Sequence, residues 1–143
     1  MQFLIFVITY PIIWLLSLLP MRILYLLSDF LYLIFFYLIG YRKKVVLENL
    51  QLAFPNKELN ELRTIQKKFF KHFTDIFIES IKAFTISEKT LIKRYKYTNP
   101  ELIDELYDKG RSIAFMGAHQ ANWEWSISIP LFVKIKCFGA YTR

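Results

Sequence analysis

The sequence predicts an α/β protein in which one or two N-terminal membrane helices precede further helices and the first βαβ part of a mostly parallel sheet. Three observations predict this class. The first 40 residues are almost entirely apolar, residues 42–84 follow a helical period, and residues 111–141 have the pattern of a strand, a helix and a second strand. Two strands joined through a helix are typical of a parallel sheet with helices on its faces.

The composition indicates that part of the chain contacts lipid. Hydrophobic residues make up 55% of the 143 residues and aromatic residues 18%, which exceeds the content of an average soluble domain. The first 40 residues hold two charges, Arg22 and Asp29, so the remainder carries the whole net charge of +7. A basic surface beside a membrane favours anionic lipid headgroups, phosphate-bearing substrates or acidic carrier proteins as partners. Nucleic acid is disfavoured because no recognisable binding module is present.

The N-terminal segment is predicted to be a retained anchor. Residues 2–19 are uncharged, long enough to span a bilayer, and followed by no small-residue cleavage site. Pro20 stands where a second helix begins. The polar residues of that second helix recur every three or four positions and so share one face: Arg22, Tyr25, Ser28, Asp29 and Tyr32. We therefore expect this helix to lie in the membrane interface or to pack on the following domain.

A hairpin that crosses the membrane twice is the alternative for these two helices. The basic cluster at residues 42–44 places the following chain on the cytoplasmic side in either case. The predicted domains are a membrane anchor at residues 1–40 and part of a catalytic domain at residues 41–143. The single cysteine, Cys137, lies in an apolar run and is expected to be a buried, reduced thiol.

Two helices are predicted beyond the anchor. The first covers residues 42–53 and ends at a proline turn, and the second covers residues 58–84. The apolar stripe of the second helix is expected to be core: Leu59, Leu62, Ile65, Phe69, Phe73, Ile76 and Phe84. Lys67, Lys68 and Lys71 lie opposite it, and they form either a solvated face or a docking site for an acidic carrier protein.

The remaining pattern is a short strand at residues 95–97, a helix from Glu101 that Gly110 closes, and the βαβ unit. The unit consists of strands at residues 111–117 and 135–141 around a helix at residues 122–132. Two strands do not complete a parallel sheet, so the chain is expected to be the N-terminal part of a longer domain and to be inactive alone.

The residues that carry the predicted chemistry follow the first strand of the βαβ unit. His119 and Glu124 stand five positions apart, which on a continuous helix would place them about 140° apart. With His119 on a loop and Glu124 in the first helical turn, the carboxylate can hold one ring nitrogen while the other faces substrate. This is the geometry of a general base, and it requires no protein nucleophile, metal or cofactor.

The segment Gly-Ala-His-Gln-Ala-Asn-Trp-Glu at 117–124 resembles the His-x4-Asp/Glu motif of lysophospholipid-type acyltransferases. More narrowly, it is similar to the Gly-His-x-Gly-Asn-Trp-Glu form of the lipid A biosynthesis (lauroyl/myristoyl) late acyltransferases. The resemblance extends to shorter segments at 18–29, 40–46, 48–50, 53–55, 99–102 and 109–111. Two positions depart from the family pattern, because Ala118 and Ala121 stand where the family often has glycine.

The resemblance implies an acyltransferase of the bacterial inner membrane. The donor would be an acyl carrier protein thioester and the acceptor a hydroxyl of a lipid A precursor, with His119 as base and Glu124 orienting it. Asn122 and Trp123 would shape the pocket, or serve as helix cap and core. Arg143 would meet a substrate phosphate.

Two other readings of the sequence stay open. The acceptor could be another lysolipid, aminolipid or glycolipid. The chain could also be a membrane-bound binding protein in which His119 is structural, although such a protein does not need a histidine and a carboxylate on one turn.

Overall fold

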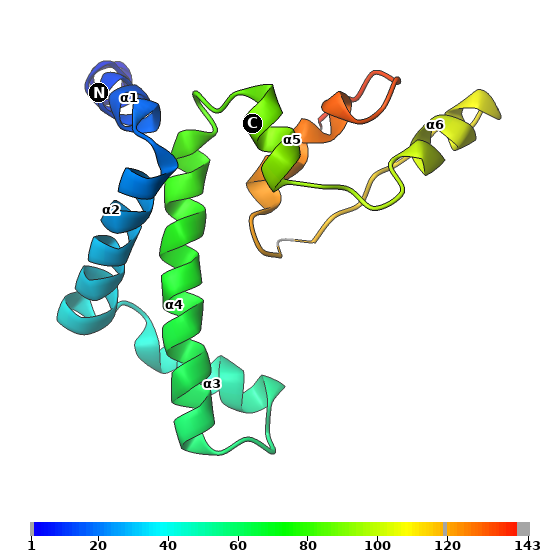
Figure 1. Ribbon diagram of the computed structural model, residues 1–143. Helices are drawn as coiled ribbons and strands as arrows, with labels where there is room; N and C mark the ends of the chain where they lie inside the picture. The colour runs from blue at the N-terminus through cyan, green and yellow to red at the C-terminus, as the bar shows by residue number, and fades with distance from the viewer. Residues whose placement is uncertain (1, 119, 140–143) are drawn as a thin grey trace. The chain divides into compact units, whose positions relative to one another are not determined.

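The computed structural model describes residues 2–118 and 120–139, and the regular elements in these ranges are all helical (Figure 1). In chain order they are α1 (Gln2–Leu18), α2 (Met21–Leu33), the π-helix η1 (Ile34–Ile39), α3 (Lys43–Ala53), α4 (Leu59–Lys82), α5 (Glu88–Arg94), α6 (Glu101–Asp108) and the 3₁₀-helix η2 (Trp123–Leu131). The chain divides into two compact units, Met1–Phe84 and Thr85–Arg143.

The predicted α/β class is wrong, because the described residues contain no strand and no sheet. The segments predicted as strands, at 95–97, 111–117 and the described part of 135–141, are irregular. Met116 is 92% exposed and Phe138 90% exposed. A parallel strand is stable only when neighbouring strands pair with its backbone and helices cover its faces. Without such neighbours, an apolar sequence pattern does not produce a strand.

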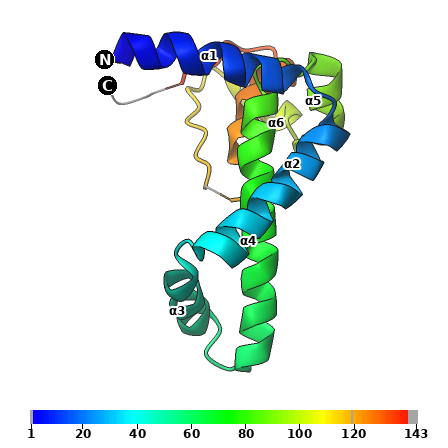
Figure 2. The ribbon, with the colours of Figure 1, turned by 90° about the vertical axis from the view of Figure 1, so that its left-hand side faces the viewer.

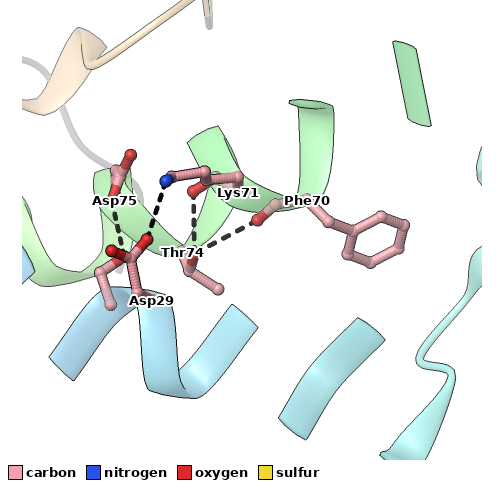
Figure 3. Close-up of polar contacts among 6 residues, drawn as sticks. Asp29, Phe70, Lys71, Thr74 and Asp75 are labelled. Atoms are coloured by element: carbon pink, nitrogen blue, oxygen red, sulfur yellow. Dashed lines mark hydrogen bonds and ion pairs between the residues drawn. The ribbon is translucent and has the colours of Figure 1, made fainter. Parts of the chain in front are cut away.

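In the first unit, α2 and α4 lie side by side in both views (Figures 1 and 2). Polar side chains join them in an antiparallel series, in which the Tyr25 hydroxyl donates to Glu79 and the Ser28 hydroxyl donates to Asp75 Oδ1 at 2.7 Å. Lys71 Nζ then lies 3.0 Å from Asp29 Oδ1, and Figure 3 shows these two side chains facing each other. The hydrogen bond and the charge of Asp29 raise the pKa of Lys71.

Three residues of the predicted polar face, Tyr25, Ser28 and Asp29, therefore contact α4, whereas Arg22 is exposed. The opposite side of α2 is apolar and exposed at positions three and four residues apart, namely Ile23, Leu26, Phe30 and Leu33. A helix with one polar face against protein and one exposed apolar face is typical of a helix at a membrane interface.

Both helices predicted between residues 42 and 84 are present as α3 and α4, but the core stripe of α4 differs from the prediction. The buried residues recur every four positions: Leu62, Gln66, Phe70, Thr74 and Ile78. Leu62 is buried as predicted, but four other residues that were expected in the core are exposed: Leu59, Phe69, Phe73 and Phe84. Polar side chains enter the core because they find partners there, as when the Gln66 amide donates to the Lys43 carbonyl oxygen.

The first helix, α1, is joined to α4 at its C-terminal end. Lys82 Nζ donates to the carbonyl oxygens of Ser17 and Leu19, at 2.7 and 3.0 Å. Ser17 lies in the last turn of α1 and Leu19 follows its end, where carbonyl groups lack partners within the helix. A lysine at this end also interacts favourably with the helix dipole.

Among the described residues, the continuous helical segment Met21–Ile39 is the one that is long and apolar enough to cross a membrane. The apolar part of α1, Phe3–Leu18, is shorter. Length and composition thus select the second apolar helix rather than the first, whereas the sequence pattern favoured residues 2–19 as the span. Gly40 ends this segment with φ +65°, a conformation that glycine adopts without steric cost.

In the second unit, η2 packs against α5. The buried apolar residues are Leu91, Trp125 and Val133. Asp104 of α6 accepts a hydrogen bond from the Lys134 backbone N–H at 2.9 Å, and Gly110 follows α6 with φ +71°, as expected for a glycine after a helix end. Cys137 is exposed, so the prediction of a buried thiol is wrong, for the same reason that the strand around it is absent.

Candidate functional site

The predicted catalytic motif lies in the second unit, on the segment that enters η2. His119 and Arg143 fall outside the described residues, so the distance from His119 to Glu124 stays a prediction. Next to the histidine in sequence, Gln120 N–H donates to the Ala118 carbonyl oxygen at 2.8 Å. Among the described residues of this region, residues 111–118 form no strand and residues 121–122 form a bend before η2.

The 3₁₀ period of η2 separates the side chains of the motif. Asn122, Trp125 and Ser128 are buried, and they stand three residues apart, which is the repeat of a 3₁₀-helix. Glu124 is exposed and Trp123 is 38% exposed. Glu124 lies in the first turn of η2, where a carboxylate is favoured by the helix dipole.

Asn122 and Trp123 were predicted either to shape the substrate pocket or to serve as helix cap and core, and their positions bear on the second alternative. Asn122 occupies the N-cap position of η2, and its carbonyl oxygen accepts a hydrogen bond from Trp125 N–H at 3.4 Å. The side chain of Asn122 makes no capping hydrogen bond. Trp123 is exposed and therefore not a core residue, whereas Trp125 is buried. Their contacts with substrate stay predictions.

Ala121 has φ +52°, which is the left-handed region that L-residues other than glycine, asparagine and aspartate rarely adopt. This is one of the two positions where the family often has glycine. The local geometry supplies a physical reason for a glycine there, and it makes Ala121 a strained residue within the predicted catalytic motif.

We expect Ala121→Gly to raise the free energy of unfolding by about 0.5–1 kcal/mol, because the loss of Cβ strain exceeds the entropy that glycine adds to the unfolded chain. Ala118→Gly is the matched control. Ala118 does not have positive φ, so this change should lower stability by about 0.5–1 kcal/mol. Thermal unfolding of the purified chain measures both. A loss of stability in both variants would contradict the strained backbone at residue 121.

Tyr97, which lies outside the motif, holds η2 in position. Its hydroxyl donates to the Ser126 carbonyl oxygen at 2.8 Å and lies 3.2 Å from Ser128 Oγ, and its ring packs edge-on against Phe132. Burial raises the pKa of Tyr97, and the hydrogen bond with Ser128 opposes this effect. Sequence reasoning assigned Tyr97 to a strand and missed this positioning role, since no local pattern links residue 97 to residues 126–132.

A cavity of about 660 Å³ lies beside the end of α6. Tyr107, Arg111 and Lys136 are among its lining residues, and the residues of the motif are not. Within the described ranges, no group of three or more His, Cys, Asp or Glu side chains is arranged to hold a metal ion. His72, the other histidine, is exposed on α4.

A comparison with known protein families matches residues 2–136 to the bacterial lipid A biosynthesis acyltransferases. The match covers nearly the whole chain, including the segment from Gly117 to Trp125. The chain therefore belongs to the bacterial lipid A biosynthesis acyltransferase family. Searches of curated proteins and of solved structures found no match.

Proposed function

We propose that this protein transfers a fatty acyl chain from an acyl carrier protein thioester to a hydroxyl of a lipid A precursor. The observation that carries this proposal is the family match over residues 2–136, because it includes the His119 and Glu124 positions. Family membership supports acyl transfer and lipid A biosynthesis. The donor, the acceptor and the catalytic roles are our proposal.

In the proposed mechanism, neutral His119 removes the proton from the acceptor hydroxyl as its oxygen attacks the thioester carbonyl carbon. The tetrahedral intermediate then expels the carrier thiolate, which takes the proton from the imidazolium. The products are an ester and a free carrier thiol, and the histidine returns to its neutral form. Glu124 holds the ring and balances the imidazolium charge, so it is a positioning residue.

The exposure of the Glu124 side chain supports its proposed role as a positioning residue. Its neighbours Asn122 and Trp125 are directed into the second unit, while the Glu124 side chain is exposed at the start of η2. In the proposed mechanism, this carboxylate approaches His119. The hydrogen bond from Tyr97 to the Ser126 carbonyl oxygen holds η2, and with it Glu124, in place for this contact.

We propose that the protein works at the cytoplasmic face of the inner membrane. The exposed apolar side of α2 and the candidate span Met21–Ile39 support membrane association. The basic residues Arg42, Lys43 and Lys44 follow this segment directly, and such clusters remain on the cytoplasmic side.

The function is tested with the purified full-length protein in mixed micelles, using acyl carrier protein thioester as donor. We expect the mass of a lipid A precursor to increase by one acyl chain, with release of one carrier thiol for each ester formed. Lysophospholipid, aminolipid and glycolipid acceptors are offered in parallel. Faster transfer to one of these would replace the lipid A acceptor, and thiol release without any acylated lipid would contradict acyl transfer.

A further inference from the structure

Two basic segments that are distant in sequence meet at one cavity in the first unit. The cavity measures about 540 Å³, which is within the range of about 300–1,000 Å³ for ligand pockets. Its cationic lining comes from the start of α3 and from α4, namely Lys43, Lys44, Arg63 and Lys67. None of its lining residues, all of which are described, is Asp or Glu. Glu48 approaches only the outer lysine, Lys44, at 3.9 Å.

The inner wall of the cavity is built from buried groups. The Nζ of Lys43 lies over the Phe36 ring, 4.1 Å from its centroid, and Phe36 is 4% exposed. Buried Gln66 donates to the carbonyl oxygen of Lys43. These two contacts fix the backbone and the ammonium group of Lys43. Binding of a ligand therefore loses less conformational entropy at this residue.

The cavity lies at the end of the candidate span Met21–Ile39. Phe36 and Tyr37 belong to this segment and line the cavity. Tyr37 is exposed and follows Leu33 of the outward apolar stripe by four residues. A tyrosine at the end of an apolar helix is typical of the headgroup level of a bilayer, which places the four cations where lipid phosphates are found.

We propose that this cavity binds the headgroup of an anionic membrane phospholipid. Lys43, Lys44, Arg63 and Lys67 would contact the phosphate, and the aromatic wall would contact the glycerol and the first carbons of the acyl chains. The apolar wall and its continuity with the exposed stripe of α2 favour a lipid over free phosphate or an acidic protein. The proposal concerns membrane attachment and does not depend on acyl transfer by His119.

The test uses the purified full chain in nonionic detergent and three probes: dihexanoylphosphatidylglycerol, dihexanoylphosphatidylcholine and inorganic phosphate. Calorimetric titration should show binding of the anionic lipid and much weaker binding of the other two. The double variant Arg63→Gln with Lys67→Gln should weaken binding of the anionic lipid about 10- to 30-fold, because each cation near a lipid phosphate contributes about 1 kcal/mol. Raising the salt concentration should weaken binding in the unaltered chain.

The matched control is Lys68→Gln with Lys89→Gln, which removes the same charge from exposed residues that do not line the cavity. This control should bind the anionic lipid within about 2-fold of the unaltered chain, and Arg63→Lys with Lys67→Arg should retain binding. Circular dichroism confirms that each variant is folded.

Four results would overturn the proposal. Equal binding of the two lipids would exclude recognition of an anionic headgroup, and equal losses in the double variant and its control would show that only net charge matters. Phosphate binding as strong as that of the anionic lipid would identify a free-phosphate site. The double variant of Arg63 and Lys67 could also lose affinity for an acidic carrier protein while it binds the anionic lipid as well as the unaltered chain does. That result would assign this face to protein docking.

Discussion

Replacing His119 with alanine in the full-length protein is expected to lower the turnover number of acyl transfer by about 10²- to 10⁴-fold, the usual contribution of positioned proton transfer. Binding of the acyl carrier thioester should change little, because in the proposed mechanism the histidine acts on the acceptor hydroxyl. The measurement is the steady-state rate of ester formation at saturating donor and acceptor. A thermal unfolding curve confirms that the variant is folded.

His72→Ala is the matched control for this variant. His72 is exposed on α4, in the first unit, and the proposed mechanism gives it no role. Its replacement should leave the turnover number within about 2-fold of the unaltered chain. Near-normal turnover in folded His119→Ala would end the catalytic assignment and would favour the reading of the chain as a membrane-bound binding protein.

Replacing Glu124 with glutamine is expected to lower turnover severely, by roughly 10²-fold or more, although the amide has nearly the same shape. An amide can still hydrogen-bond the histidine ring, but it cannot balance the charge of the imidazolium that forms in the transition state. Glu124→Asp keeps the charge and should be milder. The pH profile separates positioning from a structural role, since in the proposed mechanism the carboxylate favours the charged imidazolium and its loss should shift the profile.

Glu105→Gln is the control for the change of charge. Glu105 is an exposed glutamate of α6, and its replacement removes the same charge outside the motif. It should preserve both turnover and the pH profile. If Glu124→Gln kept the unaltered pH profile while losing turnover, the carboxylate would not act through the histidine, and another partner for His119 would have to be sought.

The helices and the polar face of the second helix could be predicted from the sequence because their signals are local. Apolar residues spaced three and four apart predicted helices over residues 42–53 and 58–84, and the structure contains both. The spacing of Tyr25, Ser28 and Asp29 predicted that one face would contact protein or headgroups. In each case, residues within a few turns of one another carry the pattern.

The motif could also be recognised in the sequence, but the structure around it could not be predicted. The order of residue types from Gly117 to Trp125 sufficed for the family resemblance, which the family match confirms. The positive φ of Ala121 and the hydrogen bond from Tyr97 to Ser126 depend on how the second unit folds around η2. No spacing rule connects a tyrosine to a carbonyl group 29 residues away.

The failed strand predictions and the shifted core have the same origin. An apolar run such as residues 111–117 is compatible with a strand, but a strand exists only if other segments pair with its backbone. Likewise, the α4 residues that become buried depend on the contacts made with α2 and α3. Gln66 and Thr74 enter the core because backbone carbonyl groups accept their hydrogen bonds. Local periodicity therefore predicted where helices form, whereas pairing, burial and the convergence of basic residues on one cavity required contacts between segments distant in sequence.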